Sequence, residues 1–150
     1  MVSPEHSDEI VATLIASDYR GAPLRKQAME AVDRLPGYNW SGIYRLEGDS
    51  LILDEYVGAE TDHTRLAVGV GVCGTAVAQN SNQLIGDVRE LDNYLACSIE
   101  TRSEIVVLIH DGSGAILGQI DIDGHTVAAF DRTDELLLER IGEILAERWN

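Results

Sequence analysis

Two cysteines, Cys73 and Cys97, are the residues of this 150-residue chain best suited to covalent or redox chemistry. In a reducing cytosol a permanent structural disulfide between them is not expected. Two interpretations stay open: a pair of buried, inert thiols, or a redox pair. The cysteines stand 24 positions apart and form no CxxC motif, so they give no zinc signature and no metal site is predicted.

Three carboxylates accompany segments that are otherwise apolar. Glu104 directly precedes an apolar run, and Asp121 and Asp123 alternate with Ile120 and Ile122. Since alternate strand positions point to the same face, the two aspartates share one face. Carboxylates beside buried residues are costly unless they are solvated, paired or functional. They could bind a substrate ammonium group, or one could stay protonated and donate a hydrogen bond. The alternative is a solvent-facing edge in an acidic protein.

The elements that must position these residues are the strands of a sheet between terminal helices. We expect Ser7 to cap the first helix and Pro23 to lie in the first turn of the second. Hairpin-joined strands indicate an antiparallel sheet in an α+β fold, with the N- and C-terminal helices on one face and loops forming a pocket on the other. The chain, residues 1–150, is predicted to be a single domain. Its expected parts are N-terminal helices over about 7–35, sheet and loops over about 39–124, and a C-terminal helix over about 131–148. Within the middle part a short helix is expected inside residues 69–80. The expected strands lie near 39–46, 51–56, 65–68, 84–88, 104–110 and 115–122.

The charge balance excludes several classes of partner. The chain has 26 Asp and Glu against 11 Lys and Arg, a net charge of −15. Such a field repels nucleic acids and anionic membranes, so neither is expected as a partner. No signal peptide or membrane-spanning run is seen, and a cytoplasmic location is expected. Lys26 is the only lysine, which fits a halophilic source or an acidic protein from an arginine-rich proteome.

Five stretches together resemble a GAF domain, and most of all the free methionine-(R)-sulfoxide reductases. They are WSGIY (40–44), GVCGTA (71–76), ACSIETRSEIVV (96–107), GQIDID (118–123) and AFDRTDELLLE (129–139). The resemblance spans roughly residues 24–148 and implies the GAF fold. It also implies a substrate pocket in which Trp40 and Tyr44 flank the substrate and Glu104, Asp121 and Asp123 contact it.

The resemblance further implies a thiol mechanism. Cys97 is the nucleophile that attacks the sulfoxide sulfur, an acid among the three carboxylates protonates the departing oxygen, and Cys97 becomes a sulfenic acid. We hypothesise that Cys73, the only other cysteine, then forms a disulfide with it and that a thioredoxin-like donor reduces the disulfide, with no metal or organic cofactor. The chain departs from the family at several places: His63 stands where relatives commonly carry a third cysteine, Ser98 where an aspartate usually follows the nucleophile, and Leu108 where a proline often follows SEIVV. The stretch YLACSIETRSE also differs from the usual one around the nucleophile.

The alternative function is a non-catalytic GAF sensor that binds a small polar ligand. An enzyme needs a reactive Cys97 with Cys73 near enough to bridge, with Cα atoms within roughly 7 Å. A sensor needs neither. In both cases the terminal helices, residues 8–20 and 133–148, could form a homodimer interface. The histidines His63, His110 and His125 are predicted to be loop or surface residues.

Overall fold

The computed structural model describes residues 1–92 and 99–150, so Cys97 lies outside the described residues. Within these two ranges six strands form one sheet in the order β3-β2-β1-β6-β5-β4, and every neighbouring pair is antiparallel. The strands are β1 (Trp40–Glu47), β2 (Ser50–Val57), β3 (Arg65–Ala67), β4 (Gln83–Ile85), β5 (Ser103–His110) and β6 (Ile116–Gly124). The predicted antiparallel sheet is confirmed.

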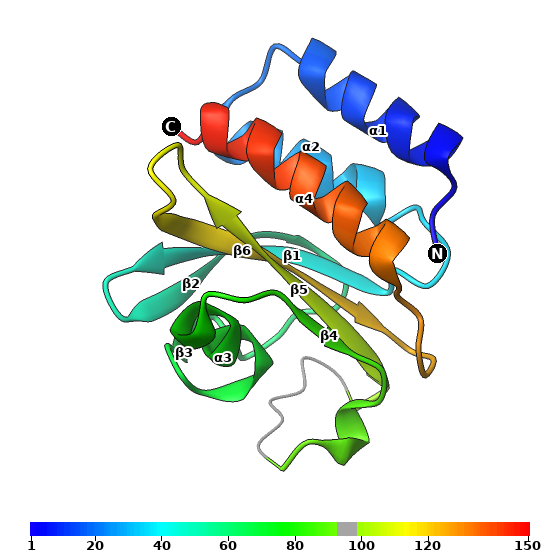
Figure 1. Ribbon diagram of the computed structural model, residues 1–150, viewed down its shortest axis with the longest axis vertical. Coiled ribbons are helices and arrows are strands. Elements are labelled where there is room, and N and C mark those ends of the chain that lie inside the picture. The colour runs from blue at the N-terminus through cyan, green and yellow to red at the C-terminus, as the bar shows by residue number, and fades with distance from the viewer. Residues whose placement is uncertain (93–98) are drawn as a thin grey trace.

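Helices cover both faces of this sheet. On one face α2 (Gly21–Val32) and α4 (Arg132–Glu147) lie against the strands, and α1 (Pro4–Ala16) packs on these two helices (Figure 1). On the other face lies the short helix α3 (Gly71–Gln79), and a 3₁₀ turn η1 (Val88–Glu90) follows β4. The α+β fold class is therefore confirmed, with one refinement: a helix as well as loops covers the pocket side. No helix in the described ranges is long and apolar enough to cross a membrane.

The helix starts follow from local capping chemistry. The first helix begins at Pro4, and the hydroxyl of Ser3 accepts a hydrogen bond from the His6 amide. The expectation that Ser7 caps this helix was wrong: Ser7 lies inside the helix and is buried, because Ser3 followed by proline already starts it. In α4 the side chains of Asp131 and Asp134 form a reciprocal capping box with the backbone.

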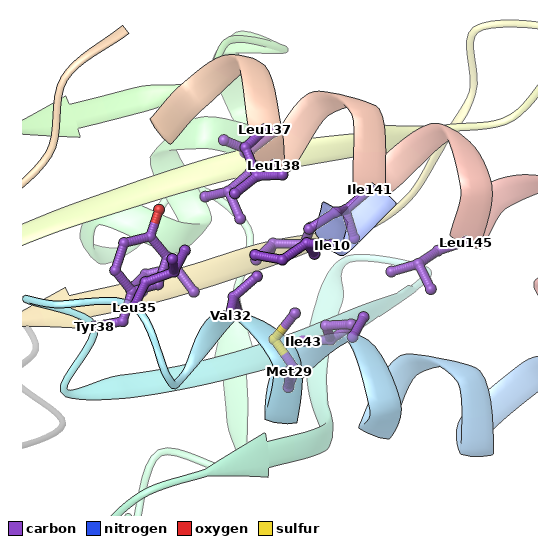
Figure 2. Packing of buried hydrophobic residues seen from close by; sticks show 14 of the residues in the cluster. Ile10, Met29, Val32, Leu35, Tyr38, Ile43, Leu137, Leu138, Ile141 and Leu145 are labelled. Carbon is purple, nitrogen blue, oxygen red and sulfur yellow. The ribbon is translucent and has the colours of Figure 1, made fainter. Parts of the chain in front are cut away.

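The main core lies between the sheet and the terminal helices. Leu137, Leu138, Ile141 and Leu145 of α4 are buried on its inner face and meet residues of α1, α2 and β1 (Figure 2). The partners labelled there are Ile10, Met29, Val32, Leu35, Tyr38 and Ile43. Isoleucines and valines of β5 and β6 complete this cluster. Burial of this apolar surface fixes the register of the central strands, since a slip by one residue would turn them over.

Candidate functional site

The residues opposite this core form what we call the site face. It comprises Trp40, Gly42 and Tyr44 of β1, Glu104, Val106 and Leu108 of β5, and Gln119, Asp121 and Asp123 of β6. Ile120 and Ile122 belong to the main core, so the alternating residues of β6 point to the site face. The predicted shared face of Asp121 and Asp123 follows from this alternation.

Strand register aligns these residues in rows across three strands. Trp40 and Glu104 both pair with Asp123, and Gly42 pairs with Asp121. Directly paired residues on one face of an antiparallel sheet have Cβ atoms about 4.5–5.5 Å apart. Strand β1 and the β5–β6 hairpin, which are far apart in sequence, therefore bring Trp40, Asp123 and Glu104 into one row.

A close backbone contact positions Cys73 over this face. Cys73 lies in the first turn of α3, directly before Gly74. A Cβ at Gly74 would lie 2.3 Å from the carbonyl oxygen of Ala67, so only glycine allows this approach. The Gly69 amide donates to the Gly74 carbonyl at 2.8 Å, which closes the turn before the helix.

A small cavity lies between α3 and the site face. The empty space amounts to about 280 Å³ including its open mouth, but the part that can hold a molecule is about the size of one water. The residues lining it are Tyr44, His63, Leu66, Val70, Gly71, Val72, Cys73, Glu104 and Asp121. Cys73, Glu104 and Asp121 thus meet at a small, largely filled cavity, together with Tyr44 and His63.

Cys73, Glu104 and Asp121 form the chemical centre of this cavity. The thiol sulfur and one oxygen of each carboxylate lie within 4.8 Å of one another, and all three residues are buried. Burial raises the pKa of Asp121, while hydrogen bonding from Glu104 and Cys73 acts in the opposite direction. Desolvation disfavours the charged form, so Asp121 holds its proton at a higher pH than an ordinary aspartate does. This centre can donate a proton in a site largely closed to solvent.

The two predicted aromatic residues have different surroundings. Tyr44 lines the cavity, and its hydroxyl donates to the carbonyl of His63 at 2.8 Å. Trp40 lies beside the cavity lining, where its indole folds over Gly42 and stacks on Tyr56 with ring centroids 5.6 Å apart. Its N–H donates to a backbone carbonyl, that of Ala59, at 3.0 Å. Trp40 can therefore act as an apolar wall rather than as a hydrogen-bond donor.

The structure also identifies two residues that sequence reasoning did not assign to the site. His63 is a loop residue, as predicted, but it lines the cavity. Gln119 is fully buried on the site face between Tyr44 and Leu108, and neither of its side-chain polar atoms has a hydrogen-bond partner within residues 1–92 and 99–150. The alternation that selected Asp121 would also have selected Gln119, two positions earlier. His110 and His125 are exposed.

Two parts of the predicted site remain predictions. Cys97 lies outside the described residues, so its distance from Cys73 stays a prediction. Asp123 is 1% exposed and directly opposite Glu104, but it is not among the residues that line the cavity. Cys73, Glu104, Asp121 and Tyr44 are the predicted site residues that the described structure brings together.

Comparisons with known proteins find free methionine-R-sulfoxide reductases and other GAF-domain proteins. No protein-family model matches the chain. The chain is 40% identical over 109 residues to the free methionine-R-sulfoxide reductase of Escherichia coli (strain K12), an alignment that covers 73% of the chain. It spans 65% of that relative's length, slightly less than two thirds.

Solved structures extend this similarity over nearly the whole chain. A type II free methionine-R-sulfoxide reductase from Thermoplasma acidophilum is 32% identical, with a TM-score of 0.79 over 96% of this chain and 94% of that one. The free methionine-R-sulfoxide reductase of Neisseria meningitidis, solved in complex with its substrate, is 29% identical. Its TM-score is 0.87 over 99% of this chain and 92% of that one.

Proposed function

Because the chain belongs to the free methionine-R-sulfoxide reductase family of GAF domains, we propose that it reduces free methionine-(R)-sulfoxide to methionine. The observation that carries this proposal is the convergence of Cys73, Glu104 and Asp121 in a small buried cavity walled by Tyr44. A sulfoxide needs a proton donor for its oxygen and thiols for its reduction, and this centre supplies a donor and one thiol.

In the first step the Cys97 thiolate attacks the sulfoxide sulfur. Asp121, whose pKa is raised by burial, gives its proton to the departing oxygen. The sulfur–oxygen bond of the substrate breaks, its sulfur gains two electrons, and methionine leaves. The oxygen ends on Cys97 as a sulfenic acid, so that thiol has lost two electrons.

In the second step Cys73 resolves the sulfenic acid. Its sulfur attacks that of Cys97, the disulfide forms and water leaves with the thiol proton. Asp121, now ionised and close to the Cys73 sulfur, would take up that proton and pass it on. A thioredoxin-like dithiol then returns two electrons and two protons by disulfide exchange. The overall balance is one sulfoxide and two thiols to one methionine, one disulfide and one water, with no metal or organic cofactor.

The test is turnover of the purified, reduced protein with the R and S forms of free methionine sulfoxide. Dithiothreitol serves as reductant, at both low and molar salt because the net charge is −15. We expect methionine from the R form only, and none from a Cys97→Ser variant. Absence of methionine at either salt level, from protein shown to be folded by circular dichroism, would leave a ligand-binding GAF domain instead.

A matched pair of glutamate-to-glutamine variants, one in the cavity and one on the surface, tests whether Glu104 contributes to turnover. Glu104→Gln keeps the size of a side chain that is 3% exposed, while Glu9→Gln makes the same change on the surface of α1. We expect Glu104→Gln to lower kcat/KM by at least about 100-fold, the lower end for a group that takes part in proton transfer, because Glu104 adjoins the proton donor Asp121. Equal activity of the two variants would exclude Glu104 from the mechanism.

A further inference from the structure

The three residues at the base of the cavity form a ligand set of mixed type. Cys73 comes from α3, Glu104 from β5 and Asp121 from β6, so three separate elements bring together one sulfur and two carboxylate groups. The three are 6%, 3% and 1% exposed, and their ligand atoms lie within 4.8 Å of one another. Sequence spacing could not indicate this set, because its members are far apart in the chain.

Asp121 supplies an independent sign that a ligand belongs here. Its carboxylate lines the cavity close to Glu104 and Cys73, yet among the described residues neither of its oxygens has a hydrogen bond of ordinary distance and angle. A buried carboxylate without such bonds is costly, and a bound cation would offset that cost by pairing with its charge.

The distances suit a tetrahedral transition metal. Zinc binds thiolate sulfur at about 2.3 Å and carboxylate oxygen at about 2.0–2.2 Å, which places ligand atoms roughly 3.4–3.6 Å apart. Side-chain rotations that move the ligand atoms by about an ångström would bring them from within 4.8 Å of one another to the roughly 3.4–3.6 Å that zinc requires. His63 lines the same cavity but lies outside this group of three, so water would take the fourth position. Magnesium and calcium are disfavoured because both prefer oxygen ligands.

We propose that Cys73, Glu104 and Asp121 form a binding site for a thiophilic divalent cation of the zinc class in the reduced protein. Binding displaces the thiol proton and any proton held by the carboxyl pair, so the affinity rises with pH. The metal occupies the floor of the cavity and withholds Cys73 from disulfide formation. The proposal goes beyond the reductase activity and does not depend on it.

Cobalt is the spectroscopic probe for this site. The reduced, metal-free protein is titrated with Co²⁺, and we expect a sulfur-to-cobalt charge-transfer band in the near ultraviolet that Zn²⁺ displaces. Cys73→Ser should abolish the band, and Asp121→Asn should weaken Co²⁺ binding by at least about tenfold, as loss of a metal-site group does. Asp18→Asn makes the same change at an exposed position and should leave binding unchanged. Cys97→Ser should retain the band.

The outcomes separate this proposal from the proposed function. A band that survives Cys73→Ser, or that is lost in Cys97→Ser, would overturn the assignment, as would equal Co²⁺ affinity of Asp121→Asn and Asp18→Asn. Circular dichroism of each variant confirms that the loss is not unfolding. The cobalt experiment needs no substrate, so it gives a result whether or not methionine sulfoxide is reduced. In an active protein, Zn²⁺ should inhibit turnover in competition with the sulfoxide.

Discussion

Replacement of Gly74 by alanine tests how the fold holds Cys73 over the site face. The new Cβ would lie 2.3 Å from the Ala67 carbonyl oxygen and 2.9 Å from the Gly69 amide nitrogen, both backbone atoms. Since real Cβ contacts hardly fall below 3.0 Å, the start of α3 must shift by at least about 0.7 Å. That shift would strain the 2.8 Å hydrogen bond between Gly69 and Gly74 and carry Cys73 with it.

Overpacking of this kind costs about 1–3 kcal/mol. For a chain of this size each kcal/mol lowers the thermal midpoint by about 2–4 °C, so we expect a decrease of about 2–12 °C. Differential scanning calorimetry measures this decrease, and turnover should fall more than stability alone explains, because Cys73 is displaced. Gly112→Ala is the matched control, since a Cβ there meets nothing within 4 Å. Equal midpoints and equal turnover of the two variants would refute the reasoning.

Three further predictions concern charge and packing. Asp121→Asn should be more stable than the wild type by about 1–3 kcal/mol at pH 7 in urea unfolding, because the buried carboxylate no longer has to ionise or keep a proton. Because burial raises the pKa of Asp121 in the folded state, the free energy of unfolding of the wild type is greatest below the unfolded pKa of about 3.9 and falls as pH rises. The stability advantage of Asp121→Asn over the wild type should therefore shrink near pH 4. Leu137→Ala, at a fully buried position of the main core, should cost about 2–5 kcal/mol in the same assay. Molar KCl should raise the thermal midpoint, because screening weakens repulsion within a chain of net charge −15.

Each of these has a contradicting result. An Asp121→Asn advantage that grows on acidification would have the wrong sign for a raised pKa. A cost below about 1 kcal/mol for Leu137→Ala would mean that the helical layer contributes little to the core. A thermal midpoint that falls in molar KCl would show that surface carboxylates are not the destabilising charges.

The sequence predicted the parts of this protein that depend on local pattern. Alternation along residues 120–123 indicated which face the two aspartates share, and turn residues located the hairpins. Tertiary contacts set the rest. The residues around Gly74 in the sequence do not predict its close contact with the Ala67 carbonyl oxygen. His63 reaches the cavity because the loop before β3 brings it there. The start of the first helix was misjudged because two serines, Ser3 and Ser7, compete as caps.

The most direct measurement of the central claim is a single-turnover reaction without external reductant. The reduced protein is mixed with excess methionine-(R)-sulfoxide, and methionine, remaining thiols and disulfide-linked peptides are quantified. The mechanism predicts one methionine and two thiols lost per chain, with Cys73 linked to Cys97. In Cys73→Ser one methionine should still form, leaving a sulfenic acid on Cys97. No methionine from the folded wild-type protein, or undiminished methionine from Cys97→Ser, would contradict the account.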